Sequence, residues 1–571
     1  MIRLTELKLP LDHPEEALPA LIIQTLGIPA GELAGHRIYK RSYDARKQKL
    51  LLVYIVDVEV APTLVASRTA LPPEGANFPR GGPSENSSSL ETRLLAKFAG
   101  HPHIRPAPDL AYYPVARADR APKIRPVVVG FGPCGIFAAL LLAQMGFQPI
   151  VLERGKKVRE RTKDTWGLWR KRVLNPESNV QFGEGGAGTF SDGKLYSQIK
   201  DPRHLGRKVM TEFVKAGAPE EILLLSKPHI GTFKLVKVVE HMRGQIEALG
   251  GEIRFEQRVS DVLLEDGPQP QGRQIRGLTV QNLKDGTSYE LRADHVVLAL
   301  GHSSRDTFAM LHERGVYMEA KPFSVGFRIE HPQGLIDRAR LGQHAGHPLL
   351  GAADYKLVHH ASNGRSVYSF CMCPGGTVVA ATSEPERVVT NGMSQYSRNE
   401  RNANAGIVVG ITPADYPGGP LAGIALQRKL ESHAFVLGGG TYEAPGQLVG
   451  DFIAGKASTQ LGSVEPSYKP GVRLTDLASA LPDYAIAALR EALPAFGRKI
   501  KGFDMHDAML TGVETRTSSP LRLTRGDDFQ SLNVKGLYPA GEGASYAGGI
   551  LSAGVDGIEV AEAVARSLLN A

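Results

Sequence analysis

Alternating apolar and polar positions divide the first part of the chain into short strands and one amphipathic helix. The strands are expected at residues 4–9, 37–43 and 50–60. The helix is expected over residues 14–26, where leucine and isoleucine recur every three or four positions. Residues 62–89 are rich in Pro, Gly, Ser and Asn, a composition typical of a linker or flap. We therefore predict a small α/β domain with a flexible linker over residues 1–100.

The clearest pattern further along is a β-α-β unit. Three valines at 127–129 predict a buried strand, and an apolar helix follows from about residue 134 to 145. Gly146 ends the helix, and a second strand over residues 149–152 leads into Glu153. A strand, a helix and a second strand in this order predict neighbouring parallel strands of a buried sheet.

Three glycines join the first strand to the helix in G-x-G-x-x-G spacing, namely Gly130, Gly132 and Gly135. The first allows a tight turn, the second lets a pyrophosphate approach the helix N-terminus, and the third lets helix and strand pack closely. Glu153 can accept a hydrogen bond from a ribose hydroxyl. The complete unit predicts a dinucleotide site; the alternative is a glycine-rich turn that binds nothing.

The end of the chain favours FAD over NAD as the dinucleotide. An apolar approach within residues 536–560 runs into Ala-Gly-Glu-Gly at 540–543, and a glycine pair at 548–549 opens another helix. In many two-nucleotide flavoproteins an acid at this place meets the ribityl chain, and the helix N-terminus stabilises the anionic reduced flavin. The run 296–301 resembles the short strand and turn that support the cofactor in such folds.

Longer motifs narrow the identification. They lie at residues 38–48, 179–195, 227–232, 300–308, 321–333 and 536–550. With these motifs the chain resembles, over nearly its whole length, a bacterial family of uncharacterised FAD-dependent dehydrogenases, or NAD(P)/FAD-dependent oxidoreductases. Cys134 is a small departure, because alanine is commoner at that place in such fingerprints.

The resemblance implies an α/β glutathione-reductase-type fold with non-covalent FAD in a Rossmann-like two-nucleotide domain. That domain is expected in two parts, 122–320 and 501–571, with a helical insertion at about 201–250. An antiparallel substrate or cap domain is expected between them, over residues 321–500. Its strands are expected near 324–329, 366–371 and 377–382.

The predicted cofactor-binding residues come from the fingerprint, the glycine-rich loop and the C-terminal motif. They are Gly130, Gly132, Pro133, Gly135, Glu153, Arg154, Gly185, Gly186, Gly188, Thr189, Val259, Gly301, Gly541, Glu542, Gly548, Gly549 and Ile550. The loop 183–188 imitates a second fingerprint, but the segment before it is too short and polar for a buried strand. Without a second nucleotide domain, NAD(P)H is expected only as a transient co-substrate.

Composition fits a large enzyme without a membrane span. Of the 571 residues 42% are hydrophobic, and no apolar run approaches the roughly 18–20 residues that cross a bilayer. The first residues do not resemble a signal peptide, and three cysteines fit a reducing cytoplasm. We therefore expect a cytoplasmic protein, and we expect no metal site.

The net charge of +8 raises the question of a nucleic-acid partner. Basic clusters lie at 156–161 and 170–172, without an accompanying RNA-binding motif. We favour a solvated helix face over a nucleic-acid surface; a basic rim that attracts an anionic substrate or NADPH lies between these two interpretations.

Candidates for chemistry beyond the flavin are few. No C-x4-C pair follows the fingerprint, which argues against the dithiol relay of disulfide reductases. Cys371 and Cys373 would face the same side of a strand, and we interpret them as buried structural thiols rather than a redox or metal-binding pair. His229 could relay a proton or could be structural.

Arginines and amides gather in residues 394–404. Arg398 and Arg401 could bind a carboxylate substrate, although a polar helix surface is the alternative. Glu514, Arg516 and Ser518 could line the same pocket. These residues are hypotheses, so the sequence leaves the catalytic residues unassigned.

The sequence thus predicts an FAD-dependent oxidoreductase that transfers a hydride between a small organic substrate and FAD. In the favoured direction the substrate reduces the flavin, which oxygen, a quinone or another acceptor reoxidises. The first alternative is an NAD(P)H-dependent reductase acting on an unsaturated substrate. A flavin-dependent RNA-modifying enzyme and a non-catalytic flavin-binding protein are further alternatives. The substrate, the acceptor and the oligomeric state do not follow from the sequence.

Overall fold

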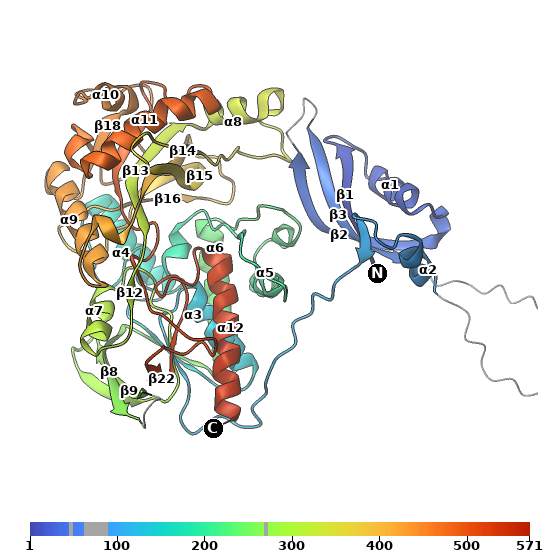
Figure 1. Cartoon of the computed structure of the whole chain (residues 1–571), viewed down its shortest axis with the longest axis horizontal. Helices are drawn as coiled ribbons and strands as arrows, with labels where there is room; N and C mark the ends of the chain where they lie inside the picture. The colour runs from blue at the N-terminus through green and yellow to red at the C-terminus, as the bar shows by residue number, and fades with distance from the viewer. Residues whose placement is uncertain (45–49, 62–88, 268–271, 571) are drawn as a thin grey trace, which may run out of the picture. The chain divides into compact units, whose positions relative to one another are not determined.

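The computed structural model describes residues 1–44, 50–61, 89–267 and 272–570 (Figure 1). Two compact units make up the chain. The first combines Met1–Ala111 with Glu220–Pro228, and the second combines Tyr112–Pro219 with His229–Ala571. Nearly all of the linker expected at 62–89 lies outside the described residues.

In its described residues the first unit is a four-stranded sheet with two helices; three of the strands and the first helix match the alternating pattern, whereas the last strand and the second helix were not predicted. Its strands are β1 (Ile2–Pro10), β2 (Leu33–Asp44), β3 (Leu51–Val60) and β4 (Ile104–Pro106), in the order β2-β3-β1-β4. The helices are α1 (Ala17–Leu26) and α2 (Leu90–Lys97). Leu18, Ile22 and Leu26 are buried because their spacing of four places them on one face of α1.

The segment Glu220–Pro228 adds to the edge of this sheet. The Arg41 N–H donates to the Leu224 carbonyl at 2.6 Å, and the Ser226 N–H donates to the Arg41 carbonyl at 2.9 Å. The helical insertion expected at about 201–250 therefore contains a stretch that pairs with β2.

A parallel sheet forms the centre of the second unit. Its strands are β5 (Val127–Val129), β6 (Ile150–Glu153), β7 (Glu252–Phe255), β11 (Val296–Leu298) and β23 (Leu537–Pro539). Their order is β23-β11-β5-β6-β7, so the chain leaves β5 on one side and later returns on the other. This is the doubly wound order of dinucleotide-binding folds, and it confirms the predicted fold class.

Helices α3 (Pro133–Gln144) and α6 (Thr232–Ala248) pack on this sheet, and α3 and α12 (Ile550–Leu569) lie side by side (Figure 1). Helix α4 (Val158–Lys171) contacts α6, and α5 (Leu205–Lys215) contacts α12. A Cβ on Gly557 of α12 would lie 2.3 Å from the Cys134 carbonyl oxygen of α3. Glycine at this crossing is what lets the two helices pack so closely.

A small sheet of mixed direction extends from the same core, with β8 and β10 antiparallel to β9 and β22 parallel to it, and its strands were not predicted from the sequence. They are β8 (Gln257–Asp266), β9 (Arg273–Asn282), β10 (Ser288–Arg292) and β22 (Val534–Lys535). Helix α7 (Arg305–Glu313) follows β11, and the short strands β12 (Glu319–Ala320) and β21 (Leu521–Arg522) pair nearby.

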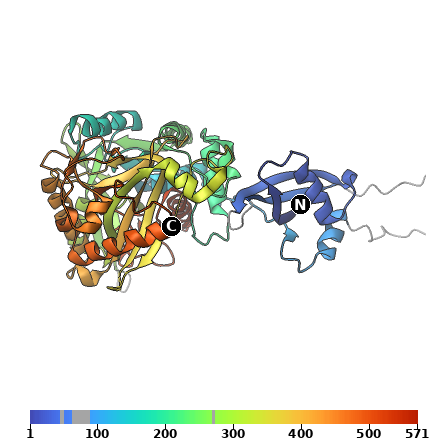
Figure 2. The same ribbon diagram turned by 90° about the horizontal axis from the view of Figure 1, so that it is seen from above.

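The third layer is an eight-stranded, mostly antiparallel sheet, which corresponds to the expected cap. Its strands are β13 (Phe323–Pro332), β14 (Val358–His360), β15 (Ser366–Ala380), β16 (Thr390–Ser394), β17 (Asn402–Ile411), β18 (Ala444–Leu448), β19 (Val472–Leu474) and β20 (Met509–Glu514). Its helices are α8 (Gln333–Leu341), α9 (Ala422–Leu437), α10 (Val449–Ala454) and α11 (Asp483–Lys499) (Figure 2). The two strands predicted at 366–371 and 377–382 are one long strand, β15. β20 belongs to this sheet although it lies beyond residue 500, in the part of the chain predicted to complete the FAD-binding domain.

No helix in the described part of the chain is long and apolar enough to cross a lipid bilayer.

Candidate cofactor site

The carboxyl ends of the parallel strands open on a cavity of about 550 Å³ within the second unit. Its wall combines residues from the two parts of the doubly wound domain, from the glycine-rich loop and from the eight-stranded sheet. Ligands of doubly wound folds bind where the strand order reverses, and cofactor pockets typically measure roughly 300–1,000 Å³. Both the position and the size of the cavity fit a nucleotide cofactor.

The three fingerprint glycines differ in how much space a side chain would find at each position. A Cβ on Gly130 would lie 2.3 Å from the Ala299 carbonyl oxygen, and one on Gly135 would lie 2.0 Å from the Gly130 carbonyl oxygen. Gly132 differs, because the nearest heavy atom to its Cβ would be the Gly186 Cα at 3.6 Å. The protein itself therefore tolerates a side chain at Gly132, and the space it would fill lies at the cavity wall.

Two helices present their N-termini to this cavity. Helix α3 begins after Gly132 and α12 begins after Gly549, and neither start has a side-chain cap. The first N–H groups of a helix have no partner within the helix, and the macrodipole gives that end a positive partial charge. Both ends are therefore suited to bind anionic groups such as a pyrophosphate.

Glu153 is fixed by backbone N–H groups at the end of β6. Its carboxylate accepts from Phe131 at 2.9 Å, Gly155 at 2.8 Å and Gly183 at 2.9 Å. The side chain is buried, yet it contributes to the cavity wall. Its position at the end of the second strand of the β-α-β unit is the one that the sequence predicted for a ribose-binding acid.

Arg161 organises the glycine-rich loop that forms another wall. Its guanidinium donates to the carbonyls of Asn179 at 2.7 Å, Val180 at 2.6 Å and Glu184 at 2.7 Å. Arg161 is fully buried, so the interpretation of cluster 156–161 as a solvated helix face is wrong for this residue. The cation neutralises carbonyl dipoles of a loop that has few apolar side chains to stabilise it.

Glu542 is the acid of the C-terminal motif and lines the cavity. Burial raises the pKa of this carboxyl to about 7, and the Lys321 ammonium opposes that rise. Among the described residues no hydrogen bond reaches the carboxyl. The carboxyl is therefore available to accept a hydrogen bond from a ligand hydroxyl.

The eight-stranded sheet contributes another part of the cavity wall, through β15 and β16. Phe370, Cys371 and Asn391 meet Asp192 and Lys194 of the glycine-rich segment there. Cys371 is only half-buried, whereas Cys373 is fully buried. The expectation of two buried structural thiols is therefore wrong for Cys371 and confirmed for the burial of Cys373.

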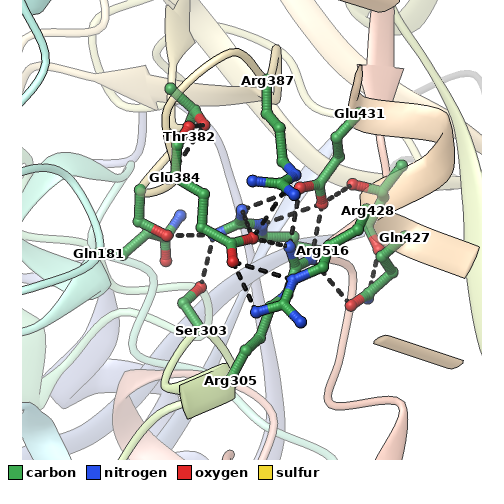
Figure 3. A network of polar contacts seen from close by, with 12 residues as sticks. Gln181, Ser303, Arg305, Thr382, Glu384, Arg387, Gln427, Arg428, Glu431 and Arg516 are labelled. Carbon is green, nitrogen blue, oxygen red and sulfur yellow. Dashed lines mark hydrogen bonds and ion pairs between the residues drawn. The ribbon is translucent and has the colours of Figure 1, made fainter. Parts of the chain in front are cut away.

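A buried ionic network lies next to the cavity, which its members Ser303 and Arg516 line (Figure 3). The Glu431 carboxylate accepts two hydrogen bonds from Arg305, at 2.7 and 2.9 Å, and two from Arg516, at 3.1 and 3.0 Å. Arg516 also donates to Ser303 at 3.0 Å. These two guanidiniums hold the pKa of Glu431 well below its usual range, despite the desolvation that opposes them.

Two other residues are linked to this network. His302 lines the cavity, and its pKa falls to about 3 because of burial and the guanidiniums of Arg516 and Arg305. Its imidazole is therefore neutral at physiological pH. Glu384 joins the network through Arg305 at 2.5 Å and Arg428 at 2.7 Å. Because every nitrogen of Arg516 already donates to protein oxygens, this arginine supports the wall rather than offering a free donor.

Most of the predicted cofactor-binding residues line the cavity. They are Gly130, Gly132, Pro133, Glu153, Arg154, Gly186, Gly188, Val259, Gly301, Gly541, Glu542, Gly548, Gly549 and Ile550. Gly135, Gly185 and Thr189 lie behind the wall. Gly185 packs against Thr189, since a Cβ on it would lie 2.1 Å from the Thr189 hydroxyl.

The candidate catalytic residues lie outside the wall. Arg398 forms an ion pair with Asp192 at 2.5 Å, and Arg401 forms one with Glu465 at 2.6 Å. His229 Nε2 hydrogen-bonds the Tyr396 carbonyl at 2.9 Å. None of the three lines the cavity, and the idea that either arginine receives a substrate carboxylate there is not supported.

Two other expectations need correction. Residues 395–401 are not a polar helix but the connection between β16 and β17. Of the ETRTSSP segment, Arg516 and Ser518 line the cavity, whereas Glu514 is buried against Arg328 at 2.6 Å.

Sequence reasoning assigned no role in the site to Asp192 and Lys194. The signal was present, because both belong to the distinctive TFSDGKL run at 189–195. The described residues contain no group of three or more His, Cys, Asp or Glu side chains that could hold a metal ion.

The fold and the site define a protein of the doubly wound, dinucleotide-binding class. A family model described as "FAD-dependent protein, C-terminal domain-like" matches residues 322–517, and a domain of unknown function, DUF8436, matches residues 1–59. A protein of Clostridium beijerinckii described as "Uncharacterized protein" is 45% identical over 563 residues, which span 98% of each chain. The chain belongs to the same family as this Clostridium protein.

Solved structures of flavoproteins are similar at low identity. A geranylgeranyl bacteriochlorophyll reductase-like protein from Thermoplasma acidophilum is 11% identical, covers 78% of this chain and 79% of its own, and has a TM-score of 0.34. E. coli quinol fumarate reductase is 14% identical, with 79% and 70% coverage and a TM-score of 0.33. Glycerol-3-phosphate dehydrogenase from Bacillus halodurans, complexed with FAD, is 12% identical, with 78% and 64% coverage and a TM-score of 0.32. Similarities this loose carry no information on the substrate.

Proposed function

We propose that the chain holds FAD non-covalently in this cavity and transfers a hydride between the flavin and a small organic substrate. The observation that carries the proposal is the opening left at Gly132, where the cavity meets the N-terminus of α3. A backbone that tolerates a side chain but carries none is suited to the close approach of a pyrophosphate.

We assign the residues of the cavity wall to the successive parts of FAD, from the adenosine to the flavin. Glu153, Arg154 and Val259 would surround the adenosine, and Gly132 and Pro133 the pyrophosphate. Glu542 would accept a hydrogen bond from the ribityl chain, and the N-terminus of α12 would meet the flavin. Bound FAD supplies the hydride chemistry, and the chain supplies binding, orientation and charge.

The substrate would meet the flavin at the wall formed by Cys371, Lys194 and Asn391. We favour an organic donor that reduces the flavin over reduction by NAD(P)H, because the chain has one dinucleotide fingerprint and FAD would occupy it. NAD(P)H would then bind only transiently, outside a preformed nucleotide domain.

Replacement of the unpartnered carboxyl tests this assignment. We expect Glu542→Ala to weaken FAD binding about 10- to 100-fold, the range of one hydrogen bond to a charged group. Glu465→Ala is the matched control, because this carboxyl is 71% exposed and pairs with Arg401 away from the cavity. The measurement is the dissociation constant of FAD by quenching of flavin fluorescence. Equal affinities for the two variants would contradict the role of Glu542.

A further inference from the structure

Cys371 occupies an irregular part of β15 at the cavity wall. Phe370 pairs with Gly406 of β17, but Cys373 pairs with Asn404, so β15 holds one extra residue between these pairs. A second irregularity follows before Gly376. Bulges of this kind are frequent next to active sites, where they redirect a side chain.

The backbone of Cys371 confirms this redirection. Its φ is +43°, in the left-handed region that residues other than glycine rarely adopt. Cys371 lines the cavity, while the neighbouring Met372 and Cys373 are buried. Local strain that exposes one reactive group is a feature that clusters at functional sites.

Cations hold the peptide groups around the Cys371 sulfur. The Arg328 guanidinium donates to the Cys371 carbonyl at 2.9 Å, and the Lys194 ammonium donates to the Met372 carbonyl. Arg328 is already paired with Glu514 at 2.6 Å. Lys194 lies 3.7 Å from Asp192.

Anions near the sulfur are largely compensated. Asp192 is paired with Arg398 at 2.5 Å, so Lys194 supplies positive charge that this carboxylate only partly balances. Glu542, whose pKa is raised to about 7, faces the same space and is partly protonated near neutrality. The surroundings therefore favour a negative charge on the Cys371 sulfur.

The second thiol lies in direct contact with the first residue. The Cys373 sulfur is 3.3 Å from the Cys371 carbonyl oxygen. The neighbouring Cys373 side chain, Lys194 and Arg328 lower the pKa of the Cys371 thiol well below its usual range, although burial opposes this. The neighbouring Cys371 side chain and burial raise the pKa of the Cys373 thiol. The surroundings thus favour the thiolate form at Cys371 and the thiol form at Cys373.

We propose that Cys371 and Cys373 form a dithiol–disulfide couple that exchanges two electrons with the flavin, with Cys371 as the sulfur that faces the cavity. The proposal rests on the proposed binding of FAD. On oxidation the Cys371 thiolate and the Cys373 thiol form an S–S bond and release one proton and two electrons. Oxidised FAD takes up both electrons and the proton and becomes the anionic dihydroflavin.

The first test reads the thiols without the cofactor. The flavin-free protein is alkylated with iodoacetamide at about pH 6 and pH 8, and each cysteine is quantified by peptide mapping. An ordinary thiol with a pKa near 8.5 reacts roughly 75-fold faster at the higher pH, because only the thiolate is the nucleophile. We expect less than about a threefold change for Cys371. Cys134 is an internal control, because burial raises its pKa and it should react slowly at both values.

The second test counts electrons. After oxidation by a disulfide reagent, anaerobic titration with dithionite should require two reducing equivalents for the flavin and two more for the S–S bond. Cys371→Ser and Cys373→Ser should each require only those of the flavin. In the oxidised wild type, mapping should find one peptide, lighter by two hydrogens, that contains both residues.

The outcomes separate this proposal from the assignment of the cofactor. A wild type that binds FAD but takes up only two electrons, with both thiols still free after oxidation, would overturn the couple and leave the cofactor assignment intact. A wild type that binds no FAD would contradict the proposed function and the electron exchange with flavin. In that case a thiolate at Cys371 and a disulfide in the apoprotein would still support the pairing of the thiols, and two unreactive thiols would overturn it.

Discussion

Single residues decide how a glycine-rich sequence becomes a site. The spacing of Gly130, Gly132 and Gly135 was visible in the sequence, but their separate roles were not, because these depend on what lies across from each Cα. Gly135 meets a backbone oxygen of the preceding turn, and Gly132 meets the cavity. Cys371 shows the same limit: its exposure depends on a bulge in β15 that alternation alone does not predict.

These roles predict opposite phenotypes for two similar substitutions. Gly132→Ala should fold with a melting temperature close to that of the wild type and retain little FAD, because the methyl group occupies the path of the pyrophosphate. Gly135→Ala should unfold at a lower temperature, because its Cβ would lie 2.0 Å from the Gly130 carbonyl oxygen. Gly244→Ala on α6 is the control, since no heavy atom lies within 4 Å of its Cβ. FAD per chain and melting temperature are measured together; a full complement of FAD in Gly132→Ala would disprove the distinction.

His331 predicts a dependence of stability on pH. Its Nε2 donates to the Phe503 carbonyl at 2.6 Å, and its Nδ1 has no partner among the described residues. Burial lowers its pKa to about 4, from an unfolded value near 6.5. The contribution of neutral His331 to the stability of the folded protein is fully present above about pH 6.5. It is lost as the pH falls towards 4, because the unfolded chain binds the proton first.

The measurement for His331 is the melting temperature between about pH 7 and pH 5. We expect the melting temperature of the wild type to fall further than that of His331→Gln over this interval, since glutamine does not titrate. An equal loss of melting temperature in both proteins would show that the pKa of His331 is not lowered in the folded state.

At the scale of elements, the strongly apolar pieces were predictable and the mixed ones were not. β5, α3 and α12 followed directly from valine runs, apolar helices and flanking glycines. β8 and β9 were missed because they carry charged residues on a half-exposed face, so their alternation is weak. A polar helix was considered for the turn after β16, because a run of arginines and amides has no hydrophobic periodicity that distinguishes a helix from a turn.

The contact between elements also carries a prediction. Glu431 of α9 is the shared partner of Arg305 and Arg516, so Glu431→Gln leaves two buried guanidiniums short of negative charge. We expect a loss of about 3–5 kcal/mol in the free energy of unfolding, the typical effect of removing one member of a buried ionic group. Glu465→Gln, which breaks an exposed pair with Arg401, should cost less than about 1 kcal/mol. Denaturant titration compares the two, and similar losses would contradict a role for the network in stability.

At the scale of the whole molecule, the sequence predicted the fold class, the discontinuous FAD-binding domain and the family. It could not predict that Glu220–Pro228 joins the sheet of the first unit, because a pairing across so many residues has no local signal. The place of β20 in the antiparallel sheet was missed for the same reason.

The single nucleotide fingerprint predicts the behaviour of nicotinamide donors. NADH and NADPH should bleach the flavin only slowly under anaerobic conditions, because FAD would occupy the one preformed dinucleotide site. Stopped-flow absorbance with both nucleotides and with a panel of amino, hydroxy and keto acids makes the comparison. Rapid reduction by NADPH that saturates in the micromolar range of good enzyme–substrate pairs would instead place the hydride source in nicotinamide.

The cofactor content of the purified protein tests the central claim most directly. The account predicts a yellow protein from which denaturation releases FAD, identified by chromatography and mass, at about one per chain. A colourless protein that cannot be reconstituted with FAD would contradict the account. Release of FMN would also contradict it, because FMN has no adenosine for Glu153 and no pyrophosphate for Gly132.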